Sequence, residues 1–277
     1  MKTVYSRALL LSLPLLFSSV QADVLLSEDF DSGERNTQDL PDTSAWYSSA
    51  SGGLNDSSGD LVSTANRFAL TYFTDSGTVD LAVGDSLTVN FSFSVSGPTA
   101  NYTNLRVGLM DSGGSRITGD LSSLSDAAFE DYSGYAAFMN VNQSSGFKLN
   151  ERLDGYQQLI HSGSAYSSLT ASSLGTGGTY DEETTYNGVF SVTRTSTGVD
   201  LYFSIDNFEG YSATVSDNVG ATISFDTFVF YGADTAVSGY SLSSVEVNYS
   251  AVPEFSSSSV VLGLAAGLAA LVSRRRR

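Results

Sequence analysis

The 277-residue chain has no cysteine, one histidine and one tryptophan. Without cysteine it can form no disulfide, thiolate metal site or iron–sulfur cluster, and it has no cysteine nucleophile. A single histidine, His161, excludes the usual multi-histidine zinc site and leaves one candidate base for a serine triad. Basic residues are also few, 13 against 30 acidic ones. The resulting net charge of −17 argues against nucleic acid as a partner, because phosphates require a cationic face.

The chain is rich in apolar and aromatic residues, which make up 41% and 12% of it. This composition can bury a sizeable core and argues against disorder for most of the chain. The length suits one large domain or two small ones.

The N-terminus has the three parts of a secretory signal peptide. A basic start precedes an apolar run over residues 8–17, and small residues then lead to Ala22. We therefore predict a signal peptide over residues 1–22, cleaved between Ala22 and Asp23. The apolar run is shorter than the ~20 residues that span a bilayer. An uncleaved anchor is the alternative.

The C-terminus combines an uncharged segment with a basic end. Residues 255–273 carry no charge, and Arg274, Arg275, Arg276 and Arg277 close the chain. At 1.5 Å per residue this segment would span about 28 Å as a helix, close to the hydrocarbon thickness of a bilayer. We expect a transmembrane helix with the arginines as a cytoplasmic stop.

Val252, Pro253 and Glu254 precede this segment. Their position before an apolar span and an arginine cluster resembles the PEP-CTERM sorting signal, over residues 251–277. The resemblance implies a Gram-negative bacterium and processing near Pro-Glu by an exosortase, after signal peptidase has acted. It also implies an inner-membrane intermediate that passes to the cell surface or extracellular matrix. Phe255 stands where the family usually has proline, and a plain tail anchor is the alternative.

The middle of the chain has the two-residue period of β-strands. Residues 86–97 alternate strictly between apolar and polar side chains, which indicates a half-buried strand. We expect further strands at 24–30, 67–73, 104–110, 135–141, 146–153, 187–195, 199–205, 223–230 and 240–249, with a hairpin at 196–198. Gly/Ser/Asp turns separate them, and the only helix expected is a short turn within 121–132. The pattern predicts an all-β, antiparallel sandwich over residues 23–250, as one domain or as two with a break near 115–134.

Four segments of this region, 26–31, 84–93, 105–109 and 225–230, resemble strands of concanavalin A-like jelly rolls. The resemblance implies a jelly-roll sandwich. That fold hosts lectins, glycosidases and adhesive modules, so it does not select an activity.

Catalytic residues are hard to find in the sequence. A glycosidase needs two facing carboxylates, and the nearest match is the acidic run 28–34. Glu28 and Glu34 share strand parity there, but Asp31 does not, and Gly33 is expected to end the strand. A second acidic run, 181–183, has the composition of a solvated loop, and His161 has no identifiable nucleophile partner. We therefore predict no catalytic residues and no enzyme.

Ligand-binding candidates are clearer. Asp29 and Asp31 precede a glycine in a manner similar to the start of a calcium loop, and suit a structural Ca²⁺; no other cofactor is predicted. Trp46 and Tyr47 lie in a Ser/Gly/Asp-rich stretch and, with Asn140, are candidates for sugar binding. For Trp46 the alternative is a place in the core, where large aromatics are usually found.

The acidity belongs to the predicted exported domain. Six of the 13 basic residues and one of the 30 acidic residues lie in the two ends, which leaves 7 against 29 and a net charge of −22 over residues 23–250. Such a domain repels anionic polymers, which favours neutral glycans or acidic ones bridged by Ca²⁺. We predict an exported, non-enzymatic sandwich associated with polysaccharide. A secreted glycoside hydrolase or polysaccharide lyase is one alternative, and a matrix protein without a ligand is another.

Overall fold

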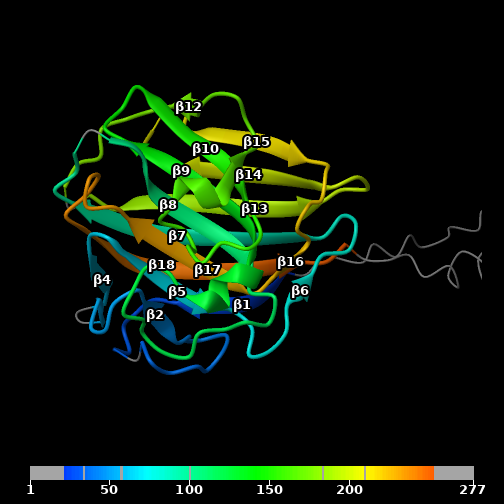
Figure 1. Ribbon diagram of the computed structural model, residues 1–277, viewed down its shortest axis with the longest axis horizontal. Helices are drawn as coiled ribbons and strands as arrows, with labels where there is room; N and C mark the ends of the chain where they lie inside the picture. The colour runs from blue at the N-terminus through cyan, green and yellow to red at the C-terminus, as the bar shows by residue number, and fades with distance from the viewer. Residues whose placement is uncertain are drawn as a thin grey trace, which may run out of the picture. The chain divides into compact units, whose positions relative to one another are not determined.

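The computed structural model describes residues 22–252 except 34, 57–58, 100, 183 and 209. In it, residues Ala22–Ala251 form one compact unit, built from two eight-stranded antiparallel sheets stacked face to face (Figure 1). This architecture confirms the predicted all-β sandwich. The described residues contain no α-helix, only two short 3₁₀ turns, η1 (Ala127–Asp131) and η2 (Gly163–Ala165).

Sheet I contains both ends of the unit. Its strand order is β15 (Ser212–Asp217), β14 (Val199–Ile205), β13 (Tyr186–Arg194), β7 (Ser86–Ser96), β18 (Gly239–Ser250), β4 (Leu61–Thr64) and β3 (Leu54–Asp56), with β1 (Ala22–Glu28) also paired to β18. β13 and β14 form the hairpin expected around 196–198.

Sheet II follows the order β11 (Tyr166–Ser168), β10 (Ser145–Arg152), β9 (Ser133–Val141), β8 (Asn101–Asp111), β17 (Thr227–Gly232), β5 (Arg67–Tyr72) and β2 (Trp46–Ser48), with β12 (Leu174–Thr176) also paired to β10. A separate two-stranded pair joins β6 (Val79–Asp80) to β16 (Ser224–Phe225).

The main core lies between the sheets. The alternation of β7 places Phe91 and Phe93 inward, where their ring centroids lie 5.9 Å from Phe228 and 5.2 Å from Phe230 of β17. Burying such rings stabilises the fold by roughly 1.5–3 kcal/mol each, and this packing fixes which face of each strand is turned outward.

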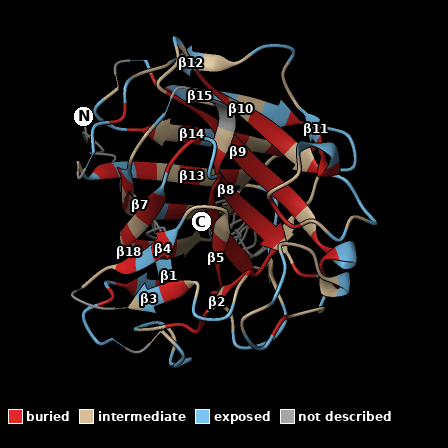
Figure 2. Ribbon diagram, turned by 60° about the vertical axis from the view of Figure 1, so that its left-hand side comes forward, coloured by how far each residue is buried: buried red, intermediate tan, exposed pale blue. Residues whose placement is uncertain are grey.

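Two connections of the chain cover the outer face of sheet II. The β8–β9 connection, 112–132, and the β10–β11 connection, 153–165, place Phe129, Ile160 and neighbouring apolar residues against it in a second hydrophobic cluster. β9 and β17 are therefore buried on both faces, and Figure 2 shows β9 in red along most of its length. The outer face of sheet I, in contrast, is exposed or half-buried along its strands.

Several expectations lie outside the described residues. They are the signal peptide up to residue 21, the sorting residues Pro253 and Glu254, the predicted transmembrane segment, and Arg274 to Arg277. No helix among the described residues is long and apolar enough to cross a membrane. Ala22 and Asp23 lie in β1, and the predicted cleavage between them stays a prediction.

Candidate functional site

The open face of sheet I presents mainly hydroxyl and amide side chains. Strand alternation turns outward Ser86, Thr88, Asn90, Ser92 and Ser94 of β7; Asn187, Val189, Ser191 and Thr193 of β13; Asp200, Tyr202 and Ser204 of β14; Ser212, Thr214 and Ser216 of β15; and Ser241, Ser244, Glu246, Asn248 and Ser250 of β18. Cross-strand pairing aligns these residues in rows. In one row Thr88 donates to the Ser191 hydroxyl at 3.0 Å, and Ser191 pairs with Tyr202.

Charge is sparse on this face. Of the outward residues named above, only Asp200 and Glu246 are ionisable at neutral pH, although the domain as a whole is strongly acidic. Asp200 accepts a hydrogen bond from Ser216, and Glu246 accepts one from Asn248. The acidic residues are therefore concentrated on other parts of the surface.

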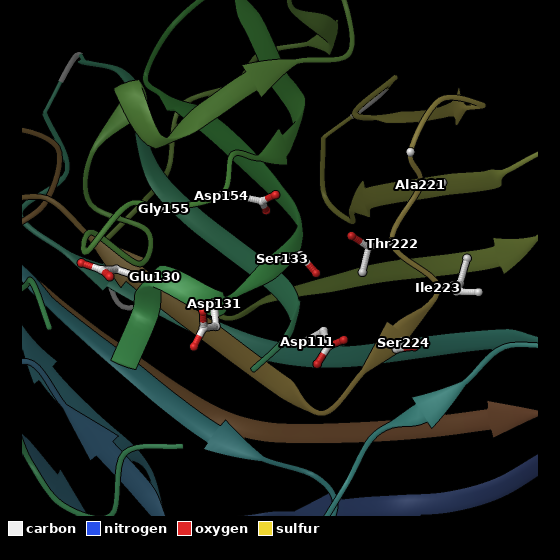
Figure 3. Close-up of a pocket in the computed structure, with 11 residues that line it drawn as sticks. Asp111, Glu130, Asp131, Ser133, Asp154, Gly155, Ala221, Thr222, Ile223 and Ser224 are labelled. Atoms are coloured by element: carbon white, nitrogen blue, oxygen red, sulfur yellow. The ribbon is translucent and has the colours of Figure 1, made fainter. Parts of the chain in front are cut away.

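A pocket of about 680 Å³ lies at one end of sheet II (Figure 3). Four carboxylate residues line it, Asp111 at the end of β8, Glu130 and Asp131 of η1, and Asp154 after β10, together with the 220–224 segment. No basic residue is among the described residues that line it. Burial, with the charges of Asp226 and Asp80 nearby, raises the pKa of Asp111 above its ordinary value, although the Gly113 amide donates to it and opposes the shift.

Buried hydrogen bonds hold the walls of this pocket. The Tyr135 hydroxyl donates to Asp217 Oδ2 at 2.8 Å and accepts from the Thr222 amide at 3.0 Å, which ties the 220–224 segment to sheet II. The buried Arg152 guanidinium donates to the carbonyl oxygens of Phe129 and Tyr132 and so fixes η1. The pocket is therefore an acidic hollow with hydrogen-bonded walls, and its carboxylates repel anions.

The predicted sugar-binding residues are not brought together. Trp46 is completely buried in the core, where its Nε1 donates to Glu28 at 3.3 Å, so its ring is not available to a glycan. The polar residues next to it in the sequence form buried hydrogen bonds and do not make up an exposed loop. Tyr47 is half-buried against Tyr72, with ring centroids 5.9 Å apart. Asn140 is 1% exposed and donates to the Ser145 carbonyl.

The predicted calcium residues lie in a turn after β1. Asp29 and Asp31 are exposed, and the amide of Asp31 donates to Asp29 Oδ1 at 3.1 Å. No group of three or more His, Cys, Asp or Glu residues in the described part of the chain is placed to hold a metal ion. A calcium site is therefore not established.

The residues weighed for catalysis are also dispersed. Glu28 is 4% exposed, and its carboxylate accepts hydrogen bonds from the amides of Phe30 and Ser44, the Thr43 hydroxyl and Trp46 Nε1. Its partner in the sequence argument, Glu34, lies outside the described residues.

His161 is half-buried in the β10–β11 connection. Burial and the charge of Arg106 lower its pKa, while the hydrogen bond to the Leu124 backbone opposes this shift. It is therefore neutral at pH 7.

No family model matches the chain, and no curated protein matches it. Solved structures match in fold. Peanut lectin with a nine-residue peptide is 8% identical at a TM-score of 0.46, covering 85% of this chain and 100% of that one. The metal-free carbohydrate recognition domain of Emp46p is 13% identical at 0.45, covering 73% and 87%. The alginate lyase Aly36B is 10% identical at 0.38, covering 76% and 87%. The likeness is one of fold and identifies no activity.

Sequence reasoning missed the outward side chains of β13 and β14. The pattern of residues 199–205 carried a signal, because Tyr202 is a large aromatic at a polar position of a strict alternation. The structure leaves this ring 39% exposed. The acidic pocket had no comparable signal, since its residues come from three separate connections and the strand ends beside them.

Proposed function

We propose that the protein is an exported, non-enzymatic β-sandwich that associates with polysaccharide in the cell envelope or the extracellular polymer matrix. The observation that carries the proposal is the open face of sheet I. Its Ser, Thr and Asn side chains both donate and accept hydrogen bonds, as sugar hydroxyls do. An extended face of hydroxyl and amide groups suits a polymer chain laid on it better than a small ligand.

The position of Glu28 supports a role without catalysis. A general acid or nucleophile must reach the substrate, whereas this carboxylate is buried and already accepts four hydrogen bonds. The alternative is a hydrolase or lyase acting at the acidic pocket, where four carboxylate residues face one hollow. Such an enzyme would release reducing ends or unsaturated products from a polysaccharide panel.

Affinity electrophoresis of the purified chain tests the association. We expect its migration to be slowed in gels that contain a neutral polysaccharide, with no release of reducing ends. Unchanged migration across neutral and acidic polymers would leave the protein as a matrix component without a glycan ligand.

Export and sorting form a second part of the proposal, which rests on the two terminal sequence patterns. Replacing Pro253 and Glu254 by Ala is expected to block processing by exosortase and leave the precursor in the membrane. A variant with the same size and the same secretion as the original chain would contradict the sorting signal.

A further inference from the structure

Two hollows lie next to each other on the open face of sheet I. The first has a volume of about 380 Å³ and is lined by residues of β1, among them Ser27, and by residues of β18, β7 and β13. The second, about 360 Å³, continues over β13, β14 and the start of β15. Both include Asn187 and Val189 in their lining, so they meet on β13. Together they cross six neighbouring strands, a length of about 24 Å at the usual strand spacing.

The amide of Asn187 is held in one orientation where the two hollows meet. Its Oδ1 accepts from the Ser92 hydroxyl at 2.7 Å, and its Nδ2 donates to Asp206 Oδ2 at 2.7 Å. The backbone amide of Asn187 donates to the other oxygen of Asp206, also at 2.7 Å. These bonds leave one amide hydrogen and one oxygen lone pair for a ligand. Because the group is already fixed, a ligand loses little additional side-chain entropy on binding there.

Tyr202 supplies an exposed ring in the second hollow. It is the one aromatic residue among the exposed large hydrophobic side chains of the described residues, at 39% exposure. In register it lies between Ser191 of β13 and Thr214 of β15. Tyrosine combines an apolar ring with a polar hydroxyl. The ring can cover the C–H face of a sugar while the hydroxyl bonds to its rim.

The charges that line the hollows select the class of polymer. The exposed carboxylates that line the hollows belong to Asp29, Asp206 and Glu246, and the described lining has no Lys or Arg. A uronate or sulfated chain would bring its negative charges close to these carboxylates without a compensating cation. A neutral chain can instead donate its hydroxyls to the exposed carboxylates.

We infer that the two hollows form one groove that binds an extended, neutral polysaccharide chain across the strands of sheet I, with Tyr202 beneath a sugar ring and Asn187 bonded to its hydroxyls. This inference rests on the proposed association with polysaccharide and adds the place and the class of ligand. Nothing in it depends on the acidic pocket at the end of sheet II.

Isothermal titration calorimetry of the purified full chain with cellohexaose, laminarihexaose and xylohexaose tests the groove, with hexaguluronate as the anionic probe. For the neutral sugar that binds, we expect Tyr202→Ala and Asn187→Ala each to weaken affinity about tenfold. Tyr202→Phe keeps the ring and should lose less than about threefold. Thr193→Ala is the matched control, because Thr193 points outward from β13, as Asn187 does, but lines neither hollow. Unchanged melting temperatures establish that the variants are folded.

The outcomes separate the groove from the wider function. Neutral binding that neither Tyr202→Ala nor Asn187→Ala weakens would overturn the groove and leave the polysaccharide association standing. Tighter binding of hexaguluronate than of the neutral sugars would overturn the ligand class. No binding of any neutral sugar overturns the inference, and unchanged migration in affinity electrophoresis as well would overturn the proposed function.

Discussion

Removing the buried carboxylate of Glu28 should destabilise the fold strongly. Glu28 ends β1, and its two oxygens accept four hydrogen bonds at 3.0–3.3 Å. Three of the donors, the amides of Phe30 and Ser44 and the Trp46 indole, are buried. The carboxylate therefore organises the connection between β1 and β2 around the edge of the core.

The expected cost follows from the donors that would be left without a partner. A buried donor that loses its acceptor costs about 1–3 kcal/mol. With three buried donors and some relaxation of the connection, Glu28→Ala should cost about 4 kcal/mol. Oε2 of Glu28 accepts three of the four hydrogen bonds, and in Glu28→Gln the amide oxygen can take its place. The NH₂ group then replaces Oε1 and faces only the Phe30 amide, which is also a donor. That variant should cost about 2 kcal/mol, the loss of one bond and a donor–donor contact.

Equilibrium urea unfolding measures both variants, with fluorescence of the single tryptophan as the probe. Trp46 is buried and bonded to Glu28, so it reports on the affected region directly. We expect lower urea midpoints at an unchanged slope. Asp75→Ala, at an exposed position, is the control and should stay within about 0.5 kcal/mol of the original chain. A Glu28→Ala cost below about 1 kcal/mol, or a Gln variant less stable than the Ala variant, would refute the reasoning.

Three further variants test other buried polar groups. Arg116→Ala leaves the 1%-exposed Asp226 without its ion-pair partner at 2.9 Å and should lower the free energy of unfolding by about 3–5 kcal/mol in urea titrations. Burial raises the pKa of Tyr72 to about 12. Because unfolded tyrosine ionises near pH ~10, stability should fall as pH rises between these values, and Tyr72→Phe should show a smaller fall in urea midpoint there. Tyr135→Phe leaves the buried Asp217 without its hydroxyl donor and should cost about 1–3 kcal/mol, with faster amide hydrogen exchange at the 220–224 segment.

The long strands of the sandwich were predictable because their burial is one-sided and regular. The alternation in β7 and in the β13–β14 hairpin carries the period of two without help from tertiary context. The short strands β2, β3 and β4 have no such pattern, since three or four residues cannot establish a period. Their pairing depends on neighbours: β2 pairs with β5, β4 with β18, and β3 with β4.

The position of Trp46 shows where local composition misleads. Ser44 and Ser48 beside it are typical of loops, yet both are fully buried. The Ser44 hydroxyl donates to the Tyr72 carbonyl at 2.9 Å, a partner 28 residues away. Burying a polar group is favourable only when such a partner exists, and a single sequence does not reveal partners at that separation.

The sequence predicts which residues of each strand point outward on sheet I, but not which of them become neighbours on that face. Each strand shows its polar side in the sequence. The row that joins Asn90, Val189 and Ser204, however, depends on the pairing of Asn90 with Val189, which lie 99 positions apart. The proposed groove arises from those pairings, as the acidic pocket arises from three connections. Both sites are therefore products of topology.

Polar side chains have different roles on the two outer faces of the sandwich. On sheet II, the buried Arg106 donates to the Ile160 carbonyl at 2.6 Å and lies 4.0 Å from the Phe138 ring. Arg152 donates to further carbonyls of the same connections. Removing a guanidinium from water is costly unless its donors are satisfied. These bonds therefore fix the connections 112–132 and 153–165 over that face and close it to a polymer. Sheet I carries no such cover among the described residues, so its rows of hydroxyl and amide groups stay open to solvent.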